Sequence, residues 1–393
     1  MAHGTLEWGQ PPIGQPVAIR VDCVKDAAGF ADLRVEWDDL LAASPASCLF
    51  LTWEWLYTWW KHLAGPRRLR LLLVRDGRQL VAIAPLTRRP PVFSRLRPFA
   101  ALEFLGTGIV GSDYLDVIVH RGSERQAGEA LADALTDVPS VIEFAQVKRE
   151  SSFAGELVRR LGQRGWGIQE TATVPCPVID LAGYSWESYL LSLGPAHFRK
   201  RLQSLEKRFD VRLDLVQTEE ERREALGILV KLHTRRWQEQ GGSGVFATPA
   251  LLAFFDEVSQ VALKRGWLRL FVLRLNNAPA AVLHGYRYGR TFYFYQLGFE
   301  PTLAKESVGF LIIGLTIRHA IEEGAAEYDF LHGGEPYKFR FARDVRELTR
   351  WEMFAPGARG AIFRRLAVVG ARARGTARRF LDDALAGVGR GRG

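Results

Sequence analysis

One stretch of the chain, residues 328–342, gathers side chains that could transfer protons. It reads YDFLHGGEPYKFRFA, a strand-like run that ends at two glycines and is followed by an acid, a phenol and an ammonium. At the mouth of a ligand site, such groups can serve as general base, general acid and anion partner. The alternative is a tight turn in which the phenol packs and the ammonium is solvated. Together with a histidine from an earlier strand, the candidate catalytic residues are Tyr337, Lys338, Asp329, His284 and Glu335.

The junction before the preceding helix, at residues 298–310, is a candidate phosphate site. The first turn of a helix has unpaired amides and a partial positive charge, so it binds anions. Serine is a favoured N-cap, so we expect Ser307 to cap this helix, with Gly309 leaving room for a phosphate oxygen. An ordinary strand-to-helix turn can have the same composition, which leaves a purely structural role open. The candidate cofactor-binding residues of the junction and the preceding strand are Tyr295, Gln296, Leu297, Lys305, Ser307, Val308, Gly309 and Phe310.

Two basic stretches on predicted helices could bind a charged substrate. They read HFRKR at 197–201 and HTRRW at 233–237. Arginine pairs well with phosphates and carboxylates, although solvated or packed helix faces have the same composition. No histidine has a metal-binding partner at usable spacing, so we expect no metal site. The candidate substrate-binding residues are Arg199, Arg201, His233, Arg236 and Trp237.

Apolar periodicity predicts the elements of the second half that position these groups. An antiparallel meander is followed by a helix and a further strand, and this order predicts a parallel crossover. A last strand is expected to close the same sheet. A long helix upstream is expected to break near Gly194 and Pro195, because proline removes a backbone donor. In chain order, we expect a helix over 186–209, strands over 268–275, 279–288 and 291–297, a helix over 307–323, and strands over 326–331 and 347–354.

The first half of the chain repeats part of this pattern. Residues 69–75 read LRLLLVR and residues 268–274 read LRLFVLR, and each run precedes a polar turn and a second strand-like run. A fold repeated twice explains the echo, although two similar strands can also arise by chance. We therefore predict a mixed α/β class with two tandem domains, over 1–180 and 181–356, each an antiparallel meander with one parallel helix crossover. In the first copy we expect strands near 69–75, 80–88, 113–119 and 141–147, and a helix near 123–136.

Charge is unevenly distributed along the chain. The net charge is +9, and residues 357–393 alone contain nine arginines against two aspartates. The remaining chain is nearly neutral, so we expect no specific nucleic-acid partner. The basic tail over 357–393 fits either contact with an anionic membrane or a packed helix with a solvated face. No apolar run could span a membrane, no signal pattern is present and the three cysteines are scattered, so we expect a cytoplasmic location, with the tail as candidate for peripheral membrane contact.

Taken together, these motifs resemble a known family. The second half resembles the GNAT-superfamily acyltransferase domain of the CelD/BcsL group, a BioF-like domain associated with cellulose biosynthesis and related to the FemAB aminoacyltransferases. In the first half, the resemblance covers FLTWEW at 50–55 and APL at 84–86. In the second half, it is carried by Trp186 and Tyr189, the basic helix Arg199 to Arg208, His233 with Arg236 and Trp237, the Ser307-Val308-Gly309 junction, and the ending from Asp329 through Gly333 to Tyr337 and Lys338.

The resemblance implies two tandem GNAT-like domains and direct attack of an amine on an acyl-CoA, usually acetyl-CoA. The acceptor would be an amine of a cell-envelope or polysaccharide-related compound. Amides near Tyr295 would bind the carbonyl oxygen, a carboxylate or His284 would take the amine proton, Tyr337 would protonate the thiolate, and Lys338 would hold a phosphate. The first copy is expected to be non-catalytic, because its equivalent loop places Glu124 where phosphate would lie.

Two other functions remain open from the sequence. One keeps the fold but takes its acyl group from an aminoacyl-tRNA, as the FemAB relatives do. The other is a non-catalytic scaffold or binding protein in exopolysaccharide assembly. Saturable binding of coenzyme A distinguishes the acyl-CoA enzyme from the scaffold, and salt-sensitive binding of tRNA marks the aminoacyl-transferase.

Overall fold

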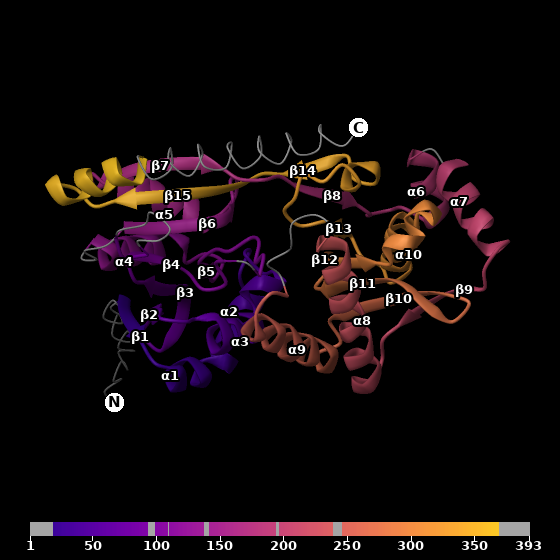
Figure 1. Ribbon diagram of the computed structural model, residues 1–393. Helices are drawn as coiled ribbons and strands as arrows, with labels where there is room; N and C mark the ends of the chain where they lie inside the picture. The colour runs from indigo at the N-terminus through magenta and orange to yellow at the C-terminus, as the bar shows by residue number, and fades with distance from the viewer. Residues whose placement is uncertain are drawn as a thin grey trace, which may run out of the picture.

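Two mixed β-sheets lie side by side in the computed structural model of the chain (Figure 1). The structure describes residues 19–92, 99–108, 110–136, 141–193, 196–238 and 246–368. Within these ranges, one sheet has eight strands and the other has seven. No helix in the same ranges is long and apolar enough to cross a membrane.

The first sheet has the strand order β1-β2-β3-β4-β6-β15-β7, and β5 pairs with β3. Its strands are β1 (Ile19–Val24), β2 (Arg68–Asp76), β3 (Gln79–Arg89), β4 (Ala101–Phe104), β5 (Ile118–Val119), β6 (Val141–Lys148), β7 (Gly167–Ala172) and β15 (Leu348–Phe354). The helices of this half are α1 (Ala27–Asp32), α2 (Arg34–Ala42), α3 (Trp53–Leu63), α4 (Glu124–Thr136) and α5 (Phe153–Gln163).

The second sheet has the order β14-β8-β13-β12-β11-β10-β9. Its strands are β8 (Cys176–Asp180), β9 (Val211–Leu215), β10 (Leu268–Leu275), β11 (Ala278–Tyr288), β12 (Thr291–Phe299), β13 (Glu327–Asp329) and β14 (Asp344–Arg346). Its helices are α6 (Trp186–Leu193), α7 (Ala196–Glu206), α8 (Glu219–Gln238), α9 (Pro249–Lys264) and α10 (Val308–Glu322), with a 3-10 helix over Pro301–Glu306.

The sequence similarity between residues 69–75 and 268–274 corresponds to a structural repeat. The hairpins β2-β3 and β10-β11 pair antiparallel, and both have a bulge at the equivalent place, before Arg75 and before Arg274 respectively. Each sheet also has one parallel pair with a helix between its strands: β4 with β6, and β12 with β13. The predicted fold class, a mixed α/β arrangement of two such units, is confirmed.

The position of the last strand corrects a sequence prediction. The strand expected over 347–354 exists as β15, but it lies in the first sheet between β6 and β7, not in the second. Figure 1 shows this yellow strand among the violet and magenta strands of the first half. In exchange, β8 joins the second sheet between β13 and β14. Alternation of apolar residues predicts a strand but cannot tell which sheet it joins.

Two other predicted strands are shorter than expected. Of residues 113–119, only β5 is a strand, because Tyr114 has a positive φ of 60° and interrupts extended backbone. Similarly, β13 ends at Asp329 rather than at 331, because Leu331 has a φ of 56° and its N–H donates to the Asp329 carboxylate. The expected helix break separates α6 from α7, although Gly194 and Pro195 themselves lie outside the described residues.

One large hydrophobic core cluster contains residues of both halves, and the second half has a further core cluster of its own. Trp55 of α3 is buried and meets Phe254 of α9 and Tyr295 of β12 edge to face, with centroid distances of 5.3 and 5.6 Å. His62 Nε2 lies 2.6 Å from a Glu257 carboxylate oxygen at the same helix contact. Such buried aromatic pairs stabilise the contact, which brings α3 of the first half against α9 and β12 of the second.

Candidate active site

The central feature of the second sheet is a gap between β12 and β13. Their parallel ladder covers only Thr291–Tyr293 against Glu327–Asp329. Beyond it, β12 continues to Phe299, and no strand in the described ranges pairs with it on this side. Unpaired backbone amides and carbonyls along a strand can bind an extended ligand. The two strands therefore separate beyond Tyr293 and Asp329.

A bulge turns the backbone of β12 within this gap. Gln296 pairs with His284, whereas Phe294 pairs with Gly285, so Tyr295 is the extra residue. A bulge re-aims backbone groups out of the regular ladder. The Tyr295 hydroxyl donates to the Val110 carbonyl oxygen of the first half. This contact brings the loop of the first half at Val110 beside the bulge residue of β12.

A pocket of about 260 Å³ lies at the far end of β12. It brings together candidates that are distant in sequence: Leu297 from β12, the start of α10, and Tyr337. Its lining residues are Leu297, Phe299, Ala304, Ser307, Val308, Gly309, Phe310, Ile313, Tyr337, Arg340 and Phe341. Five of the eight predicted cofactor-binding residues therefore line one cavity, at the N-terminus of a helix that attracts anions.

The cap of α10 differs from the prediction. Ser307 has a left-handed backbone, with φ 59° and ψ 30°, and its side chain makes no cap hydrogen bond to the helix. Instead, it ends the preceding 3-10 helix, and Arg201 of α7 donates a hydrogen bond to its hydroxyl. The expected N-cap bond is wrong because this 3-10 turn sets the entry angle of the chain. The result still places a guanidinium beside the first turn of α10.

The remaining cofactor-binding candidates lie outside the pocket lining. Lys305 is exposed on the 3-10 helix before the pocket. The Gln296 side-chain amide lies 3.2 Å from Nε2 of His233, which is buried in α8. His233, a predicted substrate contact, therefore packs behind β12.

The predicted substrate residues on α7 and α8 are dispersed. Arg199 is exposed on α7, whereas Arg201 reaches Ser307 at the pocket. Arg236 and Trp237 belong to α8, but their side chains lie outside the described part of the chain. Among the members of this set whose side chains the structure describes, Arg201 alone reaches the pocket.

The Lys338 side chain makes its polar contacts within the loop that follows β13. Its side chain is buried, and Nζ donates to the His332 carbonyl oxygen at 2.9 Å and pairs with Glu335 at 3.0 Å. The ammonium thus closes the loop that follows β13. Tyr337, by contrast, is half-buried on the pocket wall. The glycines of the opening stretch allow this loop, because Gly333 has φ 139° and a Cβ there would lie 2.4 Å from Nζ of Lys338.

Two of the predicted bases are poorly placed for proton transfer. Asp329 is fully buried, and its carboxylate accepts from the Tyr114 hydroxyl at 2.7 Å, the Leu331 N–H at 2.8 Å and Arg346 at 3.1 Å. Burial raises the pKa of Asp329 to about 6, and Arg346 opposes that shift. His284 is also fully buried, and burial lowers its pKa to about 3. Neither side chain is accessible from solvent.

One pair of titratable groups beside the gap was not predicted. His332, three residues after the end of β13, places Nδ1 2.9 Å from each carboxylate oxygen of Asp113, a buried residue of the first half. Its side chain is 42% exposed. The hydrogen bond that the ring donates to the Asp113 carboxylate raises the pKa of His332 above its usual value, against the effect of desolvation. His332 belongs to the stretch over 328–342, but nothing near Asp113 in sequence indicates the pairing.

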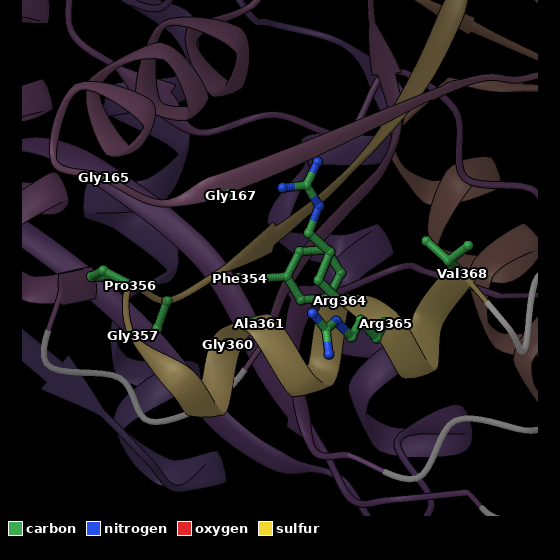
Figure 2. A pocket seen from close by; sticks show the side chains of 11 residues that line it. Gly165, Gly167, Phe354, Pro356, Gly357, Gly360, Ala361, Arg364, Arg365 and Val368 are labelled. Carbon is green, nitrogen blue, oxygen red and sulfur yellow. The ribbon is translucent and has the colours of Figure 1, made fainter.

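A larger pocket of about 700 Å³ lies in the first half (Figure 2). It is bounded by Gly167 of β7, Phe354 of β15 and the helix over 358–368, which carries Arg364 and Arg365. No carboxylate, histidine, thiol or phenol lines it in the described part of the chain. The Tyr337 phenol therefore distinguishes the smaller pocket from this larger one. Across the described ranges, no cluster of His, Cys, Asp and Glu could hold a metal ion.

Comparison with known proteins agrees with this arrangement. Residues 196–339 match the model of the acetyltransferase (GNAT) domain family. No curated protein sequence matches the chain. The comparison with solved structures adds information on the whole fold.

Several solved structures share the fold at low sequence identity. A crystal structure of FemX is 13% identical, with TM-score 0.57, covering 81% of this chain and 95% of that one. The C-terminal domain (DUF2156) of a putative lysylphosphatidylglycerol synthetase from Agrobacterium fabrum is 11% identical, with TM-score 0.52, covering 86% and 96%. L-PGS from Bacillus licheniformis is 10% identical, with TM-score 0.50, covering 86% and 95%. Residues 196–339 of this chain thus match an acetyltransferase (GNAT) domain, within a fold of two tandem GNAT-like units.

Proposed function

We propose that this protein transfers an acyl group from an acyl-CoA, most simply acetyl-CoA, to an amine of a cell-envelope or polysaccharide-related acceptor. The observation that supports it best is the continuity of the gap and the pocket. The unpaired part of β12 leads from Tyr295 to Leu297, and Leu297 lines the cavity at the start of α10. An extended pantetheine arm matches the strand edge, and a pyrophosphate matches the helix N-terminus.

The chemistry requires an oxyanion donor and an acid for the leaving thiolate. Backbone N–H groups at the Tyr295 bulge are the proposed oxyanion donors. The Tyr337 phenol, on the pocket wall, is the proposed acid. Arg201 and Arg340 supply positive charge near the diphosphate. Positioning of the amine against the thioester supplies much of the remaining rate.

Acetyl-CoA is expected to stabilise the protein against heat, and a Gly309→Glu substitution is expected to abolish that effect. A ligand at about 100 times its Kd adds about 2.7 kcal/mol to the free energy of unfolding. The new side chain would meet Phe299, whose Cδ1 lies 3.2 Å from a Cβ built at Gly309, and would place negative charge at the anion site. Melting temperature measured against acetyl-CoA concentration checks this.

Gly227→Glu is the matched control, because Gly227 is an exposed glycine of α8 with open space around its Cβ. This variant should retain the full shift. Tyr337→Phe should keep the acetyl-CoA shift but lower turnover by about 10²-fold, since it removes only the acid. If acetyl-CoA gives wild-type protein no shift, the donor proposal is wrong, and salt-sensitive tRNA binding becomes the next measurement.

The basic tail is the proposed contact with an anionic membrane surface. Its described helix, over 358–368, packs Phe363 and Ala367 against a small apolar cluster of the first half. Ile362 and Leu366 lie one turn apart on another face and are 56% and 43% exposed. Arginines at 359 and 365 flank this apolar pair. Exposed aliphatic residues bordered by cations are typical of interfacial helices.

Substituting Ile362→Ser and Leu366→Ser together is expected to weaken binding to phosphatidylglycerol-containing vesicles. Each aliphatic side chain contributes about 1.5–3 kcal/mol on burial, so the loss should exceed about tenfold. Vesicle sedimentation measures it, and added salt should weaken wild-type binding. Val35→Ser, at an exposed valine of α2, should leave binding unchanged. Equal sedimentation of the double variant and wild type would contradict the proposal.

A further inference from the structure

We infer that His332 is the general base that takes the proton of the acceptor amine, and that Asp113 of the first half is its positioning residue. This rests on the proposed acyl transfer, and it assigns the first half a part in the active site. The carboxylate of Asp113 is within 2.9 Å of Nδ1, accepts the His332 backbone N–H at 2.8 Å, and accepts from Gln146 at 2.7 Å. Asp113 therefore holds His332 both by its backbone N–H and by its ring.

One loop of the first half fixes the position of this pair beside the gap. The Val110 carbonyl oxygen accepts from the Tyr295 hydroxyl on β12, and Tyr114 donates to Asp329 at the end of β13. Between them, a Cβ built on Gly111 would lie 3.0 Å from Cε1 of His332. The loop therefore spans from the unpaired strand to the imidazole. His332 and the Tyr295 bulge face the same short segment.

The ring is arranged as a base requires. With Nδ1–H donated to a buried carboxylate, the neutral imidazole has its lone pair on Nε2. Nε2 makes no hydrogen bond within the described residues, and the side chain is 42% exposed. The charged groups that act on the ring are Asp113 and Glu335, which favour its protonation, and Lys338, which opposes it. The other predicted bases are buried, or paired as Glu335 is with Lys338.

The proton balance of the step is complete. Nε2 takes one proton from the acceptor ammonium, and the freed nitrogen lone pair forms a bond to the acyl carbon. The C–S bond then breaks, and the thiolate leaves with a proton from Tyr337. The second amine proton returns to that phenolate. The products are the amide, the free thiol of coenzyme A and a proton on His332 that passes to solvent.

Nuclear magnetic resonance of the full chain labelled with ¹⁵N and ¹³C in histidine tests the ring directly. A difference spectrum against His332→Gln assigns the signal. The expected neutral tautomer carries its proton on Nδ1, and its pKa should fall in Asp113→Asn, where the carboxylate charge is lost. An Nε2–H tautomer in wild-type protein would overturn the inference, because that nitrogen could not accept a proton.

Kinetics supply the second arm, with acetyl-CoA as donor, D-glucosamine as probe amine and thiol release as readout. The rate should rise with pH through the measured pKa of His332. His332→Gln should lose this rise with pH, the acidic limb of the profile, and its kcat should fall about 10²-fold. Added imidazole should partly restore the activity of His332→Ala. Asp113→Asn should move the limb to lower pH. Loss of kcat without movement of the limb would reduce the pair to a structural link and overturn the inference.

His62→Gln is the matched control, because His62 also pairs with a carboxylate across the two halves, 2.6 Å from Glu257, but lies at the α3–α9 contact. It should keep the wild-type pH profile. Binding of acetyl-CoA without transfer to D-glucosamine would refute that acceptor, and the tautomer would then decide for or against His332. Absence of acetyl-CoA binding would refute the proposed function, and with it the inferred base.

Discussion

Ending the chain after Arg346 is expected to abolish cooperative folding of the first half, although that half lies almost entirely upstream. This truncation removes β15, which pairs with β6 on one side and β7 on the other. Its side chains Leu348, Trp351, Met353 and Phe354 are all buried. Loss of each large core side chain costs about 2–5 kcal/mol, so their sum rivals the roughly 5–15 kcal/mol that stabilises a domain.

The matched control ends after Pro356, which keeps β15 and removes only the tail. It should unfold cooperatively, with a modest decrease in melting temperature from the loss of Phe363 and Ala367. Circular dichroism melting and limited proteolysis of both truncations check this. A chain ending after Arg346 that melts as sharply as its control would show that β15 is dispensable.

Asp329→Ala is expected to lower the free energy of unfolding by about 3–5 kcal/mol, the range for breaking a buried ion pair by removing one partner. The substitution leaves the Tyr114 hydroxyl and the Arg346 guanidinium without the acceptor they share. Asp214→Ala is the control, because Asp214 also pairs with arginines in this sheet but is 35% exposed, and it should cost at most about 1 kcal/mol. Urea unfolding measures both.

The pH dependence of stability gives Asp329 a second signature. Burial raises its folded-state pKa to about 6 from an ordinary value of 3.8. Between these values the folded state binds more protons than the unfolded state, so this group's contribution to stability falls as pH rises toward 6. Asp329→Asn should remove that slope. An unchanged slope in this variant would contradict the assignment.

The repeat and most element positions could be predicted from the sequence because they depend on local patterns. Alternating apolar residues and short polar turns predicted the meander over 268–297, and strands β10, β11 and β12 lie there. The same motif near 69–88 predicted β2 and β3. The candidate pocket residues around Gly309 were predicted from a strand-to-helix junction, whose chemistry depends on neighbouring backbone groups.

The remaining features depend on contacts between distant segments. Residues 348–354 read as a strand in either sheet, and only the crossing of the chain after β14 places β15 in the first. Ser307 is a suitable cap by type, but the 3-10 turn before it gives it left-handed backbone. Lys338 and Asp329 carry reactive groups by type, yet burial commits both to internal partners.

The sequence by itself determined the two units, their meanders and the stretch that ends the gap, since side-chain periodicity and turn chemistry act over a few residues. Only the tertiary structure decided which titratable groups at the gap are exposed and which are buried. Asp113 and His332 are 219 residues apart, and their pairing arises because a loop of one half packs against the splayed strands of the other. Exposure, ring orientation and the partner of a titratable group are properties of that packing, so no local pattern could reveal them.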